Sequence, residues 1–246
     1  MEKVEKRIVV VTGGCAGIGR AIAEAFLVNQ DNVIVFDQDQ DNVKKINSSQ
    51  NPNFKAKLVD ITKKAEIDQI VEEVINEYQR IDVLVNSAGV ARLAMAVEAN
   101  EKDWDLTMDV NVKGLFFMSQ AVGRQMIKQN NGRIINIASQ AGVVGFERHA
   151  AYTASKASVI GLTKVLAMEW AKYGVLVNAI SPTIIMTELG KKAWAGPVGD
   201  DMKKRIPLGR FGEPEEIANC VFFLASAQSS LVTGTNLVAD GGYTIQ

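Results

Sequence analysis

Short apolar runs rich in β-branched residues recur at regular intervals along the chain. Apolar character is nearly continuous within each run and does not alternate with polar positions. This pattern predicts strands that are buried on both faces, as in a parallel sheet. The seven expected strands lie at residues 8–11, 33–36, 56–59, 83–85, 134–137, 176–180 and 237–239.

Amphipathic segments with helical periodicity separate these runs. Because strand and helix signals alternate, the chain is expected to form βαβ units wound around a parallel sheet. Its 246 residues fit one α/β domain, and no repeat or linker divides them. We therefore predict a single doubly wound, Rossmann-type α/β domain across residues 1–246. The helical segments lie at residues 18–28, 65–78, 104–128, 151–173 and 214–225.

One long segment departs from this pattern. Residues 186–210 include Gly196 and Gly199, together with two prolines and several lysines. A connection of this length in a compact domain is usually functional or mobile. We expect a lid over the active site, with short helices of its own.

The composition is that of an ordinary globular protein, with 47% hydrophobic residues, 22% charged residues and a formal net charge of −1. It lacks the clustered excess of base that a nucleic-acid or anionic-membrane surface requires. The sequence shows neither a signal-peptide pattern nor an apolar run long enough to span a membrane. Its two cysteines indicate no disulfide framework, so a cytoplasmic location is expected. One histidine without a carboxylate cluster predicts no metal site.

The first strand leads into a glycine-rich loop, TGGCAGIG at residues 12–19, and a helix follows directly. Glycine is needed where backbone approaches a pyrophosphate and where a helix packs closely on a strand. The helix N-terminus adds free N–H groups and the positive end of its dipole. On this loop alone, with its G-x-x-x-G-x-G spacing, a purely structural turn stays an alternative. The candidate cofactor-binding residues here are Gly13, Cys15, Gly17, Ile18 and Gly19.

Asp37 ends the second strand, about 20 residues beyond the loop, where an acidic side chain can accept hydrogen bonds from a ribose 2′-hydroxyl. The same carboxylate repels a 2′-phosphate, and Ala16 offers no cation for one. NAD is therefore predicted in preference to NADP, with a plain turn residue as the alternative for Asp37.

Other polar and small residues follow the third and fourth strands, at the edge of the sheet where ligands bind in such folds. Asp60 is expected to accept a hydrogen bond from the adenine amino group, and Asn86 to brace the strand end. The candidate cofactor-binding residues at these positions are Asp60, Ile61, Asn86, Ala88 and Gly89.

Tyr152 and Lys156 lie four residues apart in a helical segment, so they share one helix face. A free tyrosine has a pKa of about 10. We expect the Lys156 ammonium to lower the pKa of Tyr152 toward the working pH, as general acid/base catalysis requires. Ser139 ends the fifth strand, and its hydroxyl can hold the substrate oxygen. Asn111 is unfavourable inside a helix and indicates a kink that frees a carbonyl to hold a water.

The chain resembles the short-chain dehydrogenase/reductase family from Arg7 to Gly242. This resemblance implies a seven-stranded sheet of order 3-2-1-4-5-6-7 and a catalytic tetrad of Asn111, Ser139, Tyr152 and Lys156. The matching segments are TGGCAGIG at 12–19, NSAG at 86–89, Asn111, Ser139, YTASK at 152–156 and SPTIIMT at 181–187.

The resemblance also implies how the cofactor is held. Lys156 would bind the nicotinamide ribose beside Tyr152 and would form a water relay with Asn111. Pro182, the Ile185 backbone and the Thr187 hydroxyl would lie at the nicotinamide carboxamide.

A homotetramer with two-fold axes is implied as well, in line with a second set of apolar residues on the helix at 151–173. Two positions depart from the family pattern. Ser87 stands where Asn is frequent, and Thr183 stands where Gly is usual; Thr183 leaves the nicotinamide end and the lid hinge open.

The segment between Ser139 and Tyr152 is expected to form one wall of the substrate pocket. Residues 140–149 carry a carboxamide, a carboxylate, a guanidinium and an imidazole, with few bulky apolar groups. Such a wall suits a substrate with several hydroxyls, because each needs a hydrogen-bond partner once it leaves water. A surface or cap role is the alternative for His149. The candidate substrate-binding residues are Ser139, Gln140, His149, Tyr152 and, from the lid, Trp194.

The predicted activity is NAD-dependent interconversion of an alcohol and a carbonyl. The substrate is expected to be a small polyol or vicinal diol, because the chain is similar to the NAD-dependent polyol and diol dehydrogenases of the family. A 3-oxoacyl thioester reductase is one alternative, but that group commonly uses NADP, against which Asp37 and Ala16 argue. A non-catalytic NAD-binding sensor is another, but such proteins typically lose the Tyr or Lys of the tetrad, and both are present here.

Overall fold

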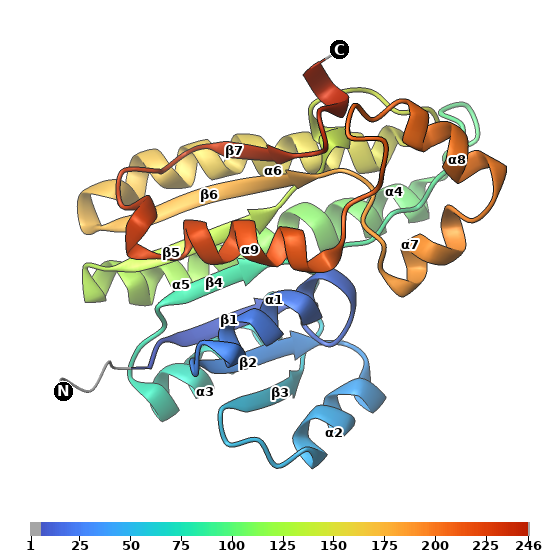
Figure 1. Cartoon of the computed structure of the whole chain (residues 1–246). Coiled ribbons are helices and arrows are strands. Elements are labelled where there is room, and N and C mark those ends of the chain that lie inside the picture. The colour runs from blue at the N-terminus through green and yellow to red at the C-terminus, as the bar shows by residue number, and fades with distance from the viewer. Residues whose placement is uncertain (1–5, 246) are drawn as a thin grey trace.

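The computed structural model describes residues 6–245. They form an α/β fold on one parallel sheet with the order β3-β2-β1-β4-β5-β6-β7 (Figure 1). The seven strands and their order are as predicted. The strands are β1 (Ile8–Thr12), β2 (Asn32–Asp37), β3 (Phe54–Leu58), β4 (Val83–Asn86), β5 (Gly132–Ile137), β6 (Val175–Pro182) and β7 (Asn236–Ala239).

Alternate side chains of the central strands β2, β1, β4 and β5 enter two separate apolar cores. In β1, Val9 and Val11 pack in a core with helices α1, α2 and α9, whereas Ile8 and Val10 pack in a core with α3, α5 and α6. Helices therefore cover both faces of the sheet (Figure 1), and both faces of its central strands are apolar. These helices are α1 (Gly17–Val28), α2 (Gln40–Ser48), α3 (Lys64–Tyr78), α5 (Leu115–Gln129), α6 (Ala150–Trp170) and α9 (Pro214–Leu224).

The helix expected over residues 104–128 is interrupted. Helix α4 (Glu101–Met108) ends before a π-helical turn at Asp109–Gly114, and α5 begins directly after that turn. Asn111 lies fully buried within the turn. A single π-helical turn inside a helix frequently marks a functional site. The irregularity predicted at Asn111 is confirmed, as a π-helical turn.

The long segment after β6 carries two short helices, α7 (Glu188–Ala193) and α8 (Pro197–Lys204), as expected for residues 186–210. The Thr187 hydroxyl caps α7 by accepting a hydrogen bond from Gly190 N at 3.1 Å. This segment packs on the loop after β5 and on the C-terminal turn. The apolar cluster that joins them consists of Met202, Ile206 and Phe211 with Phe146, Ile184, Met186, Trp194 and Tyr243.

Within residues 6–245, each helix is either too short or too polar to cross a membrane.

Candidate active site

The strand order reverses between β1 and β4, which makes the carboxyl ends of these strands the switch point of the sheet, where ligands bind in such folds. Thr12 at the end of β1 pairs with Asn86 at the end of β4, and Asn86 pairs with Asn136 of β5. The glycine loop, the segment after β4 and Ser139 after β5 therefore meet at one edge of the sheet. The residues predicted for the cofactor and the substrate reaction converge there.

Close neighbours leave no room for a larger side chain at Gly13, Gly14 or Gly19 of the glycine loop. A Cβ on Gly13 would lie 2.8 Å from Ala88 Cα, and one on Gly19 would lie 2.2 Å from the Gly13 carbonyl oxygen. Gly17 adopts a positive φ of 54°. The Ala16 N-cap offers no side-chain acceptor, so the first N–H groups of α1 are left for a ligand. This geometry fits an anionic pyrophosphate.

Asp37 is tied to the glycine loop. Its carboxylate accepts hydrogen bonds from Cys15 N and Asp39 N, both at 3.1 Å. Beside it lies a pocket of about 140 Å³ whose walls include Gly13, Asp37, Gln38, Asp60, Ile61, Ala88 and Gly89. The residues predicted to bind the adenosine half of the cofactor thus line one cavity.

Two of the predicted cofactor residues have additional roles. Burial and the neighbouring Asp37 carboxylate raise the pKa of the Cys15 thiol to about 12, so Cys15 stays protonated and acts as a small side chain. The Asp60 carboxylate accepts hydrogen bonds from Thr62 N and Oγ1, at 3.0 and 2.7 Å, and thereby holds the turn after β3.

Asn86 is buried at the end of β4, and its amide faces neighbouring elements rather than open space. Its Nδ2 donates to Ser119 Oγ at 2.9 Å and to Asn136 Oδ1 at 2.8 Å, and Asn136 in turn donates to Thr163 Oγ1. The bracing role predicted for Asn86 therefore matches its contacts. Ser87 and Ala88 are held through their backbone N–H groups, which both donate to Thr12 Oγ1 at 3.1 Å.

Tyr152 and Ser139 meet through a hydrogen bond between their side chains. The Ser139 hydroxyl also accepts a hydrogen bond from Ala141 N at 3.1 Å, which fixes its position after β5. Burial raises the pKa of Tyr152, and the hydrogen bond with Ser139 opposes that rise. Burial is the larger cause, so the pKa of Tyr152 is raised in this structure rather than lowered as expected.

Lys156 is only 5% exposed, and burial lowers its pKa to about 8. Its Nζ donates to the Ile137 carbonyl oxygen at 2.7 Å and lies 5.7 Å from the centre of the Tyr152 ring. A Cβ on Gly89 would lie 3.5 Å from the same Nζ. Lys156 is therefore placed between Tyr152 and the backbone of the predicted cofactor site.

Asn111 joins the π-helical turn to two other segments. Its Oδ1 accepts from Val90 N at 2.8 Å, while its Nδ2 donates to the Val90 carbonyl at 2.9 Å and to Ser155 Oγ at 3.0 Å. Ser155 Oγ donates onward to the Tyr152 carbonyl at 2.7 Å. The sequence reasoning missed Ser155, although its place beside Lys156 on the buried face of the helix was available as a signal.

The predicted nicotinamide end is built by the turn after β6. Ile185 is buried, and its carbonyl accepts from Thr187 N at 2.8 Å. A Cβ on Gly17 would lie 3.3 Å from Thr187 Cγ2, so the start of the segment after β6 faces the glycine loop. Pro182 closes β6 by pairing with Ala239 of β7. Contacts of Pro182, Ile185 and Thr187 with a nicotinamide stay a prediction.

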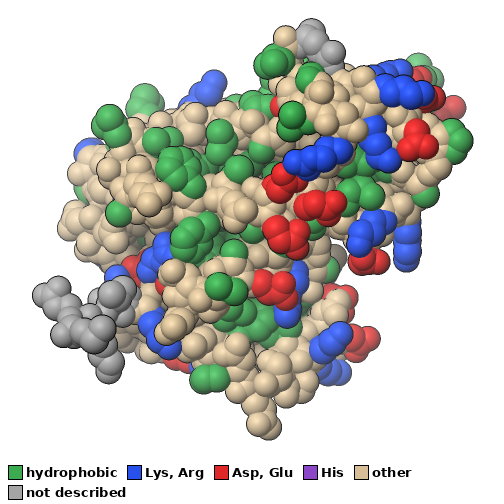
Figure 2. Space-filling view, in the orientation of Figure 1, with side chains coloured by type: hydrophobic (Ala, Val, Ile, Leu, Met, Phe, Trp, Pro, Cys, Tyr) green, Lys and Arg blue, Asp and Glu red, His purple; other side chains and the backbone are tan. Residues whose placement is uncertain are grey.

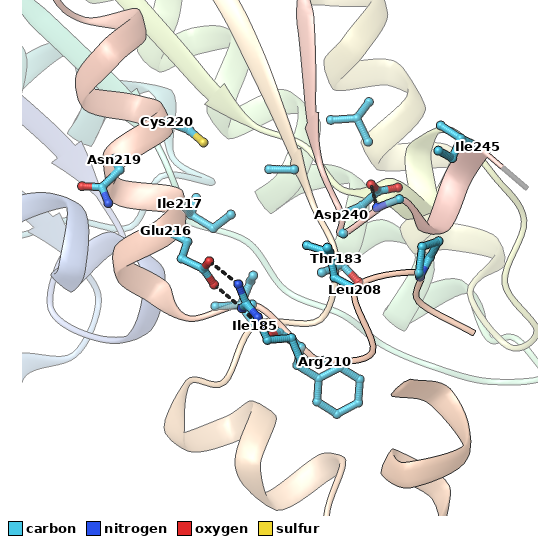
Figure 3. A pocket seen from close by; sticks show the side chains of 17 residues that line it. Thr183, Ile185, Leu208, Arg210, Glu216, Ile217, Asn219, Cys220, Asp240 and Ile245 are labelled. Carbon is cyan, nitrogen blue, oxygen red and sulfur yellow. Dashed lines mark hydrogen bonds and ion pairs between the residues drawn. The ribbon is translucent and has the colours of Figure 1, made fainter. Parts of the chain in front are cut away.

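Thr183, which departs from the family pattern, faces a different space. It lines a pocket of about 730 Å³ between α9, β7 and the segment 207–212 (Figure 3). An ion pair between Arg210 and Glu216 lies in its wall at 2.7 Å. None of the four tetrad residues lines this pocket. The Thr183 side chain thus turns away from the predicted reaction centre, and the turn after β6 forms with threonine in place.

Ser139 and His149 are the predicted substrate residues that contact Tyr152. Gln140 is only 3% exposed, and its Oε1 has no hydrogen-bond partner among residues 6–245. The half-buried His149 ring lies edge-on to Tyr152, with 6.0 Å between ring centres. Trp194 packs on Phe211, with 5.9 Å between ring centres, in the apolar cluster that joins the segment after β6 to the loop after β5.

The wall after β5 is less polar than expected. Phe146 packs in the same apolar cluster and stacks on Tyr243. Arg148 lines a separate small pocket beside α4. Sequence polarity alone did not reveal these orientations. Two polar side chains of this loop stay candidates for substrate contact. His149 lies beside Tyr152, and Gln140 is buried with no hydrogen-bond partner for its Oε1 among residues 6–245.

Comparison with known proteins places these features in context. A family profile described as enoyl-(acyl carrier protein) reductase matches residues 13–244. The chain is 53% identical to an NAD-dependent glycerol dehydrogenase of Listeria innocua, over 99% of this chain and 96% of that one. It is 44% identical to a D-threitol dehydrogenase of Mycolicibacterium smegmatis, over 99% of this chain and 95% of that one.

Two further similarities bear on cofactor and substrate. A 3-oxoacyl-[acyl-carrier-protein] reductase of Thermotoga maritima is 40% identical over 99% of this chain and 100% of its own length. The crystal structure of an NAD⁺-bound xylitol dehydrogenase superimposes with a TM-score of 0.90 at 31% identity, covering 96% of this chain and 98% of that one.

Proposed function

The chain belongs to the short-chain dehydrogenase/reductase family of oxidoreductases, and we propose that it oxidises a small polyol or vicinal diol with NAD. The observation that carries the proposal is the meeting of Tyr152, Ser139 and Lys156 beside the pocket that Asp37 lines. A proton-transfer group and a dinucleotide site with a fixed carboxylate are thereby brought together.

The residues of this site fit NAD. The uncapped N-terminus of α1 suits the pyrophosphate, and Asp37 suits the adenosine ribose. Lys156 would hold the nicotinamide ribose, and Pro182, Ile185 and Thr187 would lie at the carboxamide. When bound, NAD supplies a hydride acceptor for the carbinol carbon.

The chain's own residues manage the proton. Ser139 holds the substrate oxygen through its hydroxyl, and Tyr152 removes the hydroxyl proton as the carbonyl forms. The buried Lys156, close to the Tyr152 ring, favours the phenolate when it is charged. Asn111 holds the segment at Val90 and, with Lys156, would connect Tyr152 to solvent through water.

The polyol assignment rests on polar groups of the loop after β5, Gln140 and His149. The buried Gln140 Oε1 is an acceptor without a partner, and such a group is costly unless a ligand satisfies it. A hydroxylated substrate supplies that donor. The similarity to glycerol and threitol dehydrogenases supports the same class. The lid segment, residues 186–210, would close over this substrate through Trp194.

The 3-oxoacyl thioester reductase is the second candidate, favoured by the similarity to the Thermotoga protein. Asp37 argues against the NADP that such enzymes commonly use. A catalytically inert NAD sensor is disfavoured, because Ser139, Tyr152 and Lys156 are all present and such a sensor does not need this set of proton-transfer residues.

The test is a substrate panel with purified protein. We expect NAD-dependent oxidation of one or more C3 to C6 polyols or diols and little reduction of acetoacetyl thioesters. Tyr152→Phe should lower kcat by at least about 100-fold and keep NADH binding, because only the proton acceptor is lost. Efficient thioester reduction without polyol oxidation would overturn the assignment, as would substantial activity of a folded Tyr152→Phe protein.

The proposal also covers the location and the assembly of the enzyme. We expect the enzyme to be a cytoplasmic homotetramer, with residues 1–246 as one catalytic unit.

A further inference from the structure

Four aromatic rings form a row from the C-terminal turn to the catalytic tyrosine. Tyr243 stacks on Phe146 with 5.4 Å between ring centres and an interplanar angle of 18°. Phe146 lies 5.6 Å from the His149 ring, which lies 6.0 Å from the Tyr152 ring. The imidazole of His149 is thus held between an apolar ring and the reacting group.

A hydrogen bond fixes which nitrogen of His149 carries the proton. Its Nδ1 lies 2.6 Å from the Glu147 carbonyl oxygen. A carbonyl only accepts, so Nδ1 must be the donor, and in the neutral imidazole Nε2 is then an acceptor. The backbone is fixed as well, because Thr153 N donates to the His149 carbonyl at 2.7 Å and Ala94 N donates to the Arg148 carbonyl at 3.1 Å.

We propose that His149 Nε2 accepts a hydrogen bond from a second substrate hydroxyl, on the carbon next to the one that reacts. This inference rests on the proposed function and narrows its substrate class to vicinal diols and polyols. Two hydroxyls on adjacent carbons are close enough for one to lie at Ser139 and Tyr152 and the other at His149. A simple alcohol cannot make this hydrogen bond, so the half-buried His149 acceptor favours the diol over it.

The C-terminal turn positions His149 through Phe146. The Asp240 carboxylate accepts hydrogen bonds from Gly242 N at 2.8 Å, Thr244 N at 2.7 Å and Thr244 Oγ1 at 2.8 Å. These bonds fix the turn that carries Tyr243, and the stack on Phe146 carries the restraint to His149. Tyr243 is therefore a positioning residue for diol recognition.

The main test compares two substrates that differ by one hydroxyl, propane-1,2-diol and propan-2-ol. The wild-type enzyme should favour the diol in kcat/KM. His149→Phe keeps a ring and removes both nitrogens, so it should lower kcat/KM for the diol by about tenfold and change that for propan-2-ol less than about threefold. His149→Gln restores an acceptor near the Nε2 position and should recover part of the loss. The KM for NAD should not change in either variant.

The outcomes separate this inference from the proposed function. If His149→Phe lowers kcat/KM equally for both substrates, the recognition role is refuted while the dehydrogenase assignment stands. If the wild type oxidises neither these compounds nor other polyols, the proposed function itself fails. Where wild-type turnover of propan-2-ol is too slow, the inhibition constants of the two compounds against glycerol oxidation provide the same comparison.

A second pair of variants tests the positioning role. Tyr243→Phe keeps the stacked ring and should leave the preference for the diol intact. Tyr243→Leu removes the stack and should lower that preference by about threefold, with propan-2-ol and the KM for NAD unaffected. An unchanged preference in Tyr243→Leu would refute the restraint through Phe146.

Discussion

Asp37 holds a fixed place at the end of β2, because its two carboxylate oxygens accept backbone hydrogen bonds from Cys15 and Asp39. The carboxylate cannot swing away from a 2′-phosphate without breaking both bonds. We therefore predict that NAD is preferred over NADP by at least about 100-fold in kcat/KM, or ~3 kcal/mol. Asp37→Ser combined with Ala16→Arg should shrink or reverse the preference. Steady-state kinetics with both cofactors measure it, and equal use of the two by the wild type would contradict the prediction.

Lys156 shows the cost in stability of a functional group that is buried. Its pKa is lowered by burial to about 8 from the ordinary 10.5, and the unfolded chain keeps the ordinary value. Below pH 8, Lys156 is protonated in both the folded and the unfolded state, so the free-energy cost of burying its charge is fully present. Between pH 8 and 10.5 the unfolded state binds more protons, so the contribution of Lys156 to stability rises with pH.

The prediction follows from a comparison with Lys156→Met, which has no titrating group there. In the absence of NAD, the free energy of unfolding of the wild type should rise by about 3 kcal/mol relative to that of Lys156→Met between pH 7 and pH 10.5. Urea denaturation across this range measures the difference, and other titrating groups cancel between the two proteins. Parallel pH profiles would mean that the lysine is not desolvated as described.

The four residues of the proposed tetrad could be singled out from the sequence because each of these residue types has a chemical reason at its position. The raised pKa of Tyr152 and the tautomer of His149 could not be predicted, since they depend on burial and on the Glu147 carbonyl contact, which only the folded chain provides.

Among the helices, the π-helical turn at Asp109–Gly114 depends on a contact that sequence spacing does not show. Asn111 Nδ2 reaches Ser155 Oγ on α6, and both side chains are fully buried. Ser155 thereby links the turn to the helix that carries Tyr152 and Lys156.

We predict that Ser155→Ala lowers kcat by about tenfold, because a buried hydrogen bond worth roughly 1–3 kcal/mol is lost and Asn111 is less firmly held. The KM for NAD should change little. Ser158→Ala is the matched control, since its hydroxyl bonds only to the Ala154 carbonyl within the same helix. Steady-state kinetics and thermal melting compare the two, and equal effects of both substitutions would argue against a special role for Ser155.

Helix α2 could not be recognised from the hydrophobic periodicity of the sequence. Only Val43 and Ile46 of its nine residues are buried, so its apolar stripe is too short to stand out. Its start is marked instead by Asp39, whose carboxylate accepts from Asp41 N and Asn42 N. The strands were predictable because both of their faces are buried, whereas the orientations of Phe146 and Arg148 depend on what packs over the loop.

Two surfaces of the described chain present apolar side chains without a covering element. Strand β7 is the edge of the sheet, and the face that it shares with α9 bears hydrophobic side chains, while charged side chains gather around α7 and α8 (Figure 2). Leu208, Val238 and Ile245 are exposed around the pocket of Figure 3. An open strand edge and an apolar pocket together favour a partner subunit.

The second surface is the outer side of α6. Val165 and Met168 are 46% and 76% exposed, and a Cβ on Gly161 would meet nothing within 4 Å. With the exposed Ala157, these residues lie three or four positions apart and so form one helix face. Small and apolar residues there permit a second helix to approach closely. Two separate apolar surfaces are what a tetramer with two-fold axes needs.

We therefore predict a tetramer at micromolar concentration, and a smaller species for Val165→Arg. The arginine would place an unpaired charge in the α6 face once a second subunit covers it, which costs several kcal/mol per site. Val28→Arg is the matched control, because Val28 is 86% exposed at the end of α1, outside both surfaces. Light scattering with sedimentation gives the mass of each protein. A monomeric wild type, or a Val165→Arg tetramer as stable as that of Val28→Arg, would show that α6 does not form the interface.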